Sequence, residues 1–227
     1  SCNRGVLMNP LKITMRISGE IMGPAVHLDG LLAARCAVRR KMPPVGVAGD
    51  LLEANLAVLR EDVAECLKWE GRFFLCSNPV FEVEQRDRRF LTRRFQTERA
   101  ASLGSEKVRK IELSTGPSKL FRVPVSTEIL SEDSIEWLAV GDPARIADLL
   151  SEVSHIGKKR SQGLGKVEGF AIEPVETQQE GFPVVHNEAP LRALPPDYPG
   201  LRNPRLALDS LCFPYWDIGR RVMCAVP

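Results

Sequence analysis

The chain has 227 residues, 44% of them apolar, and a net charge of only +2. This length fits one large domain or one domain with sizeable insertions, and this apolar share excludes a disordered chain. The six cysteines form no C-x-x-C pair, so the sequence supports neither a zinc site nor a disulfide framework. We expect buried free thiols, which are typical of a cytoplasmic protein, and neither a metal nor a cofactor. Because there is no long apolar span, we expect no membrane segment.

The first predicted elements are a strand and two helices. Residues 12–21 alternate between polar and apolar side chains, which predicts a half-buried strand. Leucines and a cysteine then recur at helical spacing over 28–36, and a pair of prolines stops that helix. Asp50 and Glu53 form a capping pair at the start of an inserted helix, which we place at 50–70.

Four short strands are expected in the middle of the chain. An apolar run at 73–76 predicts a buried strand, and alternating apolar and acidic residues predict a second short strand at 81–83. Alternation returns at 121–129, where Pro124 favours a position at the edge of a sheet. The last of the four lies at 135–140.

One more helix and one more strand complete the regular part of the sequence. Asp142 and Pro143 suit the N-cap and the first turn of a helix, which we expect to stop at Gly157. The strand follows at 167–172. Prolines then punctuate residues 176–227, which predicts long irregular coil with a few short elements.

The order of these elements predicts an α+β fold. It matches the ferredoxin-like βαββαβ plan shared by RNA-recognition modules, with insertions. We place this domain at 11–175, with the inserted helix at 50–70 and a basic thumb at 86–118. Residues 176–227 form a Pro-rich C-terminal extension, or a small subdomain, packed on it.

The most informative motif is a glycine-rich loop between the last predicted helix and the last predicted strand. Its glycines let the backbone turn at positive φ and approach a ligand closely. Its cations, hydroxyl and amide suit phosphate oxygens, and its spacing matches neither the P-loop nor the dinucleotide fingerprint. We interpret it as a clamp on a nucleic-acid backbone; the alternative is a solvated basic turn. The loop and the lysine after it are Gly157, Lys158, Lys159, Arg160, Ser161, Gln162, Gly163, Leu164, Gly165 and Lys166.

A second basic region covers residues 86–110. It holds nine cations and three carboxylates, a net charge of +6, so the rest of the chain carries −4. It has too few apolar residues for a core element, and we expect a projecting hairpin or mobile arm with a nucleic-acid-binding surface. The alternatives are a solvated face for the cations and packing inside the hairpin for the two phenylalanines. The candidate residues are Arg86, Arg88, Arg89, Phe90, Arg93, Arg94, Phe95, Arg99, Lys107, Arg109 and Lys110.

These motifs resemble the RAMP superfamily of CRISPR effector proteins. Members of that superfamily carry a Gly-rich basic loop at this position, and the loop at 157–165 resembles it closely. The stretch at 27–33, His-Leu-Asp-Gly-Leu-Leu-Ala, resembles the start of the first RAMP helix. Size and layout over residues 11–175 are most similar to the type IV subunit that caps the 5′ end of the guide RNA.

The resemblance implies a non-catalytic function in antiviral and anti-plasmid defence. Such a subunit grips the 5′ handle of the guide RNA and docks against a backbone subunit and a large subunit of the complex. It lies near the target DNA, and a helicase is a further candidate partner. On this chain the loop would contact handle phosphates and bases. The thumb would pass between guide nucleotides or touch the neighbouring subunit.

The resemblance also raises an enzymatic alternative. Some RAMP relatives cut precursor guide RNA without metal, using a histidine near the first strand–helix junction, where His27 stands. A base with a pKa near neutrality suits removal of a 2′-hydroxyl proton, and a loop lysine would stabilise the charge. The structural alternatives are a helix cap or a packed core residue. We expect no tyrosine beside His27, because Tyr198 and Tyr215 belong to the C-terminal extension.

A third possibility is a stand-alone RNA-binding adaptor outside CRISPR systems. It would use the same glycine-rich loop without a filament partner. RNA-recognition modules carry an aromatic pair on their central strands, but the strands predicted here are aliphatic. Backbone contact by the loop and the thumb is therefore favoured over stacking on the sheet.

Overall fold

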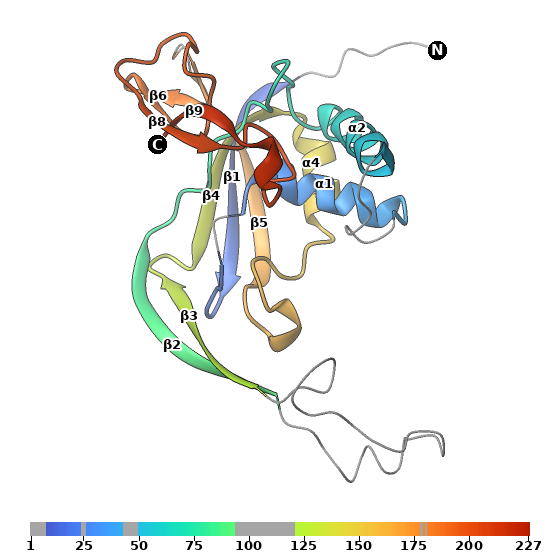
Figure 1. Cartoon of the computed structure of the whole chain (residues 1–227), viewed down its shortest axis with the longest axis vertical. Helices are drawn as coiled ribbons and strands as arrows, with labels where there is room; N and C mark the ends of the chain where they lie inside the picture. Colours follow the sequence, from blue (N-terminus) through green and yellow to red (C-terminus); the bar gives the residue numbers. More distant parts are fainter. Residues whose placement is uncertain (1–7, 24–25, 43–49, 94–120, 178, 180) are drawn as a thin grey trace.

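The computed structural model of the protein describes residues 8–23, 26–42, 50–93, 121–177, 179 and 181–227 (Figure 1).

A three-stranded antiparallel sheet forms the centre of the molecule. β1 (Asn9–Ser18) lies between β4 (Ser134–Gly141) and β5 (Lys166–Pro174). Along β1 every second side chain from Leu11 to Ile17 is buried, whereas those between them lie on the more exposed face. The first and the last two predicted strands are therefore confirmed, although the first begins and ends three residues earlier than predicted.

Three helices pack against the buried face of this sheet. α1 (Leu28–Arg39) contacts both α2 (Asp50–Ala64) and α4 (Pro143–Leu150). Their apolar stripes join the buried side of β1 in one hydrophobic core, and burial of this surface at about 25 cal/mol per Å² holds the layers together. Among the described residues, no helix combines the length and the apolar character that crossing a membrane requires.

The start of α4 is as predicted, but its end is not. Asp142 caps the helix, because its Oδ1 accepts hydrogen bonds from the backbone N–H of Ala144 at 2.9 Å and of Arg145 at 3.2 Å. The helix ends at Leu150, well before the predicted stop at Gly157. The intervening residues turn back toward the sheet and form one bridge to the start of β5.

The inserted helix, α2, is shorter than predicted. It ends at Ala64, because the chain then turns to the edge of β4, where the Lys68 N–H donates to the Val140 carbonyl at 2.9 Å. The side chain of Glu53 forms an ion pair with Arg220. The side chain of the other predicted capping residue lies outside the described residues.

The predicted strand at 73–76 is buried but does not form a continuous ladder. Two isolated bridges, Cys76 to Ala139 and Val80 to Glu136, place residues 75–80 antiparallel to the outer edge of β4. Pro79 has no N–H to donate to such a ladder. The order across the sheet is therefore β5, β1, β4 and then this segment.

A long two-stranded hairpin projects from the body (Figure 1). It consists of β2 (Val83–Arg93) and β3 (Phe121–Leu130), paired antiparallel from Val83–Leu130 to Arg93–Phe121. The expected projecting hairpin is therefore present, and the strand predicted at 81–83 instead begins at Val83 and extends to Arg93. Pairing with β3 satisfies the backbone of the basic residues, so the strand continues through them without an apolar face.

The C-terminal part forms short strands around a small core of its own. β6 (Val185–His186) pairs with β7 (Ala189–Pro190), and β8 (Arg205–Asp209) pairs with β9 (Val222–Val226). A one-turn helix, η3 (Ile218–Arg220), precedes β9. This second core also includes two buried side chains from the body, Phe73 and Leu75.

Candidate nucleic-acid interface

The base of the glycine-rich loop is closed by backbone contacts that only glycine permits. The Ile156 N–H donates to the Gly165 carbonyl at 2.8 Å. Gly165 has φ +65°, and a Cβ there would lie 2.1 Å from the Ile156 carbonyl oxygen. Gly157 has φ +77°, and a Cβ there would lie 2.8 Å from the Met22 oxygen. Both glycines are therefore required by close backbone approach.

The tip of the loop is a single helical turn that carries exposed polar side chains. η2 (Arg160–Gln162) is flanked by two left-handed residues, Lys159 at φ +58° and Gly163 at φ +82°. Leu164 is buried and anchors the turn. Within the described residues, none of the three loop cations has a carboxylate partner. The exposed side chains are Lys158, Lys159, Arg160, Ser161 and Gln162.

Lys158 and Lys166 each make a contact with a residue outside the glycine-rich loop. The Lys158 N–H donates to the Met22 carbonyl at 2.7 Å, and its aliphatic stem lies close to Gly23. Lys166 is the first residue of β5 and forms an ion pair with Glu168 at 2.9 Å. The hydrogen bond that Lys166 donates within this ion pair lowers the pKa of the Glu168 carboxyl group. Lys166 is therefore partly neutralised, unlike the three cations at 158–160.

The loop and the hairpin are attached to the same short segment of chain. The Gly165 N–H donates to the Glu20 carbonyl at 2.8 Å, and Ile21 exchanges two hydrogen bonds of 2.9 Å with Glu128 on β3. The side chain of Glu20 pairs with Arg89 on β2. Figure 1 shows the loop and the hairpin at the same end of the molecule, so the structure brings the described part of the second basic region, on β2, to the end that carries the loop.

One face of the hairpin carries an exposed aromatic ring between arginines. The ring of Phe90 is half exposed, at 52%, and the guanidinium of Arg122 lies 4.3 Å above its centroid. Arg88 points to the same face, two residues away on β2. Arg86 shares this face but forms an ion pair with Glu128 at 3.1 Å. Phe90 is therefore not packed inside the hairpin, so that alternative is wrong for this residue.

Sequence reasoning missed Arg122. It lies beyond the basic window, and only the antiparallel register, which pairs it with Thr92, brings it beside Phe90. The other candidates of this region cannot be placed. The side chain of Arg93 and all of Arg94, Phe95, Arg99, Lys107, Arg109 and Lys110 lie outside the described residues.

His27 stands at the N-cap of α1, but its side chain makes no capping hydrogen bond. Its ring stacks on Tyr215, with centroids 3.8 Å apart and planes 18° apart. The expectation that no tyrosine lies beside His27 is therefore wrong, because the C-terminal extension folds back onto the first helix. Desolvation lowers the pKa of His27, which favours its neutral form.

Tyr215 belongs to a buried polar cluster that joins α1 to the C-terminal extension. Its hydroxyl donates to Asp29 Oδ2 at 2.6 Å and accepts from Arg192 Nη2 at 2.9 Å. Arg192 also donates to the backbone oxygens of Phe74 at 2.7 Å and Leu211 at 2.6 Å. Burial raises the pKa of Tyr215 well above its usual value. The tyrosine hydroxyl is therefore engaged and protonated, and the cluster has a structural role.

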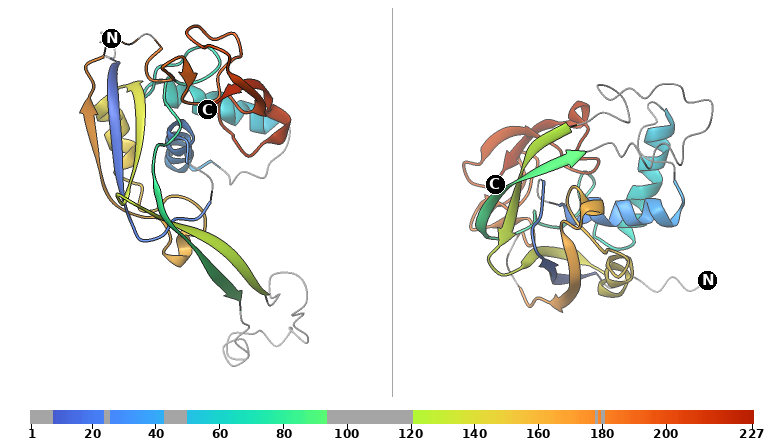
Figure 2. Two further views of the ribbon diagram at one scale, coloured as in Figure 1. Left: turned by 90° about the vertical axis from the view of Figure 1, so that its left-hand side faces the viewer. Right: turned by 90° about the horizontal axis from the view of Figure 1, so that it is seen from below.

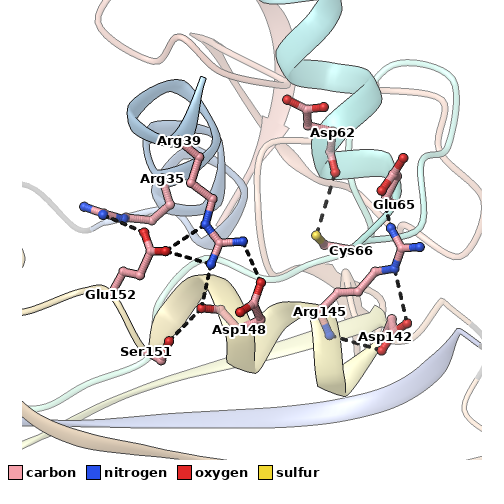
Figure 3. A network of polar contacts seen from close by, with 10 residues as sticks. All are labelled: Arg35, Arg39, Asp62, Glu65, Cys66, Asp142, Arg145, Asp148, Ser151 and Glu152. Carbon is pink, nitrogen blue, oxygen red and sulfur yellow. Dashed lines mark hydrogen bonds and ion pairs between the residues drawn. The ribbon is translucent and has the colours of Figure 1, made fainter. Parts of the chain in front are cut away.

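Several arginines on the helical side are paired with carboxylates. Figure 3 shows Arg39 of α1 between Asp148 and Glu152, with Nε donating to Glu152 at 2.8 Å. Arg145 of α4 pairs with Glu65 in the same view. Hydrogen bonds from arginine lower the pKa of both Asp148 and Glu152. Within the described residues, no three His, Cys, Asp or Glu side chains are placed to hold a metal ion.

Comparison with known proteins identifies the family. The family model described as CRISPR type IV associated protein Csf3 matches residues 9–227, which include the sheet, the hairpin, the glycine-rich loop and the C-terminal extension. No curated protein matches the chain. The resemblance to type IV CRISPR proteins is thereby confirmed: the chain belongs to the Csf3 family of CRISPR type IV associated proteins.

Proposed function

We propose that this protein is the subunit of a type IV CRISPR effector complex that binds the 5′ handle of the guide RNA. The observation that carries the proposal is the glycine-rich loop. Its base is pinned by backbone hydrogen bonds, and its three exposed cations at 158–160 have no carboxylate partner within the described residues. A pinned turn with free cations is preorganised for phosphate oxygens, because little conformational entropy is lost on binding.

The hairpin supplies a second set of contacts beside the loop. Arg88 is exposed on the face that carries Phe90 and Arg122, and it has no ion pair within the described residues. An exposed ring with a guanidinium above it is a surface on which bases stack, at about 1–3 kcal/mol per base. We propose that guide RNA runs from the loop onto this face and that the hairpin acts as the thumb.

The sheet order supports a RAMP ferredoxin-like domain. In that plan the last strand lies beside the first, followed by the third and then the second. Here β5 lies beside β1, β4 follows, and residues 75–80 lie at the outer edge. We propose that these four segments are the ferredoxin-like strands and that β2 and β3 are an insertion between the second and third of them.

The remaining partners follow from membership of the complex. We propose contacts with a backbone subunit and a large subunit, with target DNA nearby and a helicase as a further partner, in the cytoplasm. On this proposal the protein does not itself cut RNA. The half-buried stack of His27 on Tyr215 supports that, because both rings pack against the body and the tyrosine hydroxyl is already bound.

Metal-independent RNA cleavage is the second candidate, because His27 does have a tyrosine against it. A histidine and a tyrosine are a usable pair for proton transfer. Incubation of the protein with a repeat RNA in the presence of a chelator tests this directly. Cleavage that disappears in His27→Ala would replace the binding proposal by the nuclease one. Intact RNA after incubation with the parent protein would exclude metal-independent RNA cleavage as the function.

The binding proposal is tested by fluorescence anisotropy with an RNA that carries the 5′ handle. The variant Lys158→Ala/Lys159→Ala/Arg160→Ala should bind on the order of 10–100-fold more weakly, because charge-assisted contacts to phosphates are lost. The matched control is Lys41→Ala/Lys68→Ala/Arg202→Ala, which removes three exposed cations elsewhere. Equal affinities of the two triple variants would contradict the loop assignment. Handle binding equal to that of an unrelated RNA favours a stand-alone adaptor.

A further inference from the structure

A second arginine-lined site lies away from the loop and the hairpin. It is a cleft of about 280 Å³ between α2, the turn at 69–74 and the C-terminal extension. Figures 1 and 2 place α2 and the C-terminal extension at the end of the molecule opposite the hairpin. Among the described residues, three arginines line the cleft, Arg60, Arg72 and Arg220, and no carboxylate does.

The three arginines come from three separate elements and differ in how they are held. Arg220 on η3 is fixed by Asp217, 3.1 Å from its Nε, and by Glu53 of α2. Arg60 and Arg72 have no ion pair within the described residues. The Nε of Arg60 is buried and has no hydrogen-bond acceptor. A buried donor without a partner is unfavourable, so the guanidinium of Arg60 is not fully satisfied by the described residues.

Arg72 is carried by a rigid turn. The Glu70 N–H donates to the Phe73 carbonyl at 2.9 Å and closes the turn. Gly71 has φ +76°, and a Cβ there would meet nothing within 4 Å, so the backbone is open at the edge of the cleft. Its N–H donates to no acceptor among the described residues. The turn therefore places Gly71, whose N–H is unpaired among the described residues, and Arg72 at the wall of the same cleft.

The wall of the cleft includes an aromatic ring. Trp69 packs on Phe74, with centroids 4.7 Å apart and planes 59° apart, and it also lines the cleft beside Phe213. Arginines with an indole suit a nucleotide, whose phosphate binds guanidinium and whose base packs on the ring. An acidic peptide is the less favoured ligand, because its backbone N–H groups need acceptors and no side-chain carboxylate of the part of the chain that the structure describes lines this cleft.

The larger cleft between the helices is a useful comparison. It has a volume of about 490 Å³, and its arginines are matched by carboxylates: Arg40 binds Asp62 through two hydrogen bonds of 2.5 and 2.6 Å. Figure 3 shows the neighbouring pairs along the same groove. A phosphate there would have to displace a carboxylate from each arginine. In the smaller cleft, a phosphate would have no carboxylate of the described residues to displace from Arg60 or Arg72.

We infer that the cleft bounded by Arg60, Arg72, Arg220 and Trp69 binds a nucleoside phosphate, as a free nucleotide or as one unit of a single strand. The phosphate lies on the guanidinium groups of Arg60 and Arg72 and on the Gly71 N–H, and the base lies on Trp69. This site is separate from the proposed guide-RNA interface and does not depend on it.

The test is calorimetric titration with adenosine 5′-monophosphate, inorganic phosphate and adenosine. The background protein carries Lys158→Gln/Lys159→Gln/Arg160→Gln, so binding at the loop does not contribute. Arg60→Gln/Arg72→Gln should weaken monophosphate binding by about tenfold or more, and Arg72→Gln alone, on the exposed turn, should give part of that loss. Lys68→Gln removes one nearby exposed charge and should change nothing. Trp69→Leu should weaken binding of the monophosphate by about five- to tenfold but leave binding of phosphate unchanged.

Two further arms decide the source and the class of the ligand. A short 5′-phosphorylated RNA that binds more tightly than the monophosphate points to a strand, whereas equal affinities point to a free nucleotide. The inference is overturned if the monophosphate does not bind or if the arginine variants bind it as the background protein does. Binding of an acidic peptide in place of the monophosphate also overturns it.

Discussion

The helical side of the molecule and its loop–hairpin end use basic side chains in opposite ways. On the helical side, Arg39 lies between Asp148 and Glu152 and joins two helices (Figure 3). At the loop–hairpin end, the cations at 158–160 are exposed and have no carboxylate partner within the described residues. The difference teaches that a near-zero net charge conceals two populations of cations, one paired with carboxylates inside the fold and one exposed without such partners among the described residues.

The largest effect on stability is expected at Arg192, the most deeply buried of the described arginines that form ion pairs. Arg192→Met should lower the free energy of unfolding by about 3–5 kcal/mol, because it leaves Asp29 buried without its counter-charge. Urea denaturation measures this. Arg202→Met, at an exposed position, is the control and should cost little. A loss of less than about 1 kcal/mol in Arg192→Met would mean that the cluster does not hold the C-terminal extension on α1.

The next largest effect distinguishes the base of the glycine-rich loop, which is held by backbone hydrogen bonds, from its exposed tip. Gly165→Ala should lower the free energy of unfolding by about 2–3 kcal/mol and also weaken RNA binding, because its Cβ would collide with the Ile156 oxygen. Gly163→Ala meets open space and should cost only about 1 kcal/mol, from its positive φ. Thermal denaturation and anisotropy of both variants provide the comparison. Equal costs would contradict the pinned geometry.

A smaller effect concerns pH. Because burial lowers the pKa of His27, its contribution to stability is complete above about pH 6.5 and is lost as the pH falls through the folded pKa. The stability of the parent should therefore fall between about pH 7 and 5. His27→Phe keeps a ring against Tyr215, and its stability should fall less over the same interval. The free energy of unfolding of both proteins is measured by urea denaturation at each pH. If it falls equally in the two proteins, His27 is not the cause of the pH dependence.

The smallest effect is expected on the exposed helical face. Arg39→Gln removes contacts to Asp148 and Glu152, but this network is exposed and screened by solvent. The midpoint of thermal unfolding should fall slightly, and the fall should shrink with added salt and at a pH low enough to protonate the two carboxylates. RNA affinity should be unchanged. A clear loss of RNA affinity would place nucleic acid on the helical side and break the comparison.

Local signals in the sequence predicted the elements of the body well. Alternation identified β1, the stripe beginning at Leu28 identified α1, and the Asp142–Pro143 pair identified the start of α4. Each of these signals depends on neighbours within a few residues. The end of α2 and the extent of β2 were missed, because each is decided by pairing with a strand far along the chain.

The candidate site was predicted in composition but not in arrangement. The loop and the hairpin cations were recognised as basic, yet which of them are already paired depends on contacts such as Arg89 with Glu20. Tyr215 reaches Asp29 across 186 positions of sequence, and no periodic pattern reports a contact of that kind. Arg122 gains its place above Phe90 only through strand register.

The most direct test of the central claim is the salt dependence of RNA binding. For a single strand, the slope of log K against log salt changes by about 0.7 for each phosphate contact. Replacing Lys158, Lys159 and Arg160 by alanine should therefore reduce the steepness of that slope by about 2, with the fold intact by circular dichroism. A slope equal to that of the parent protein would contradict the assignment of these three cations to the RNA backbone.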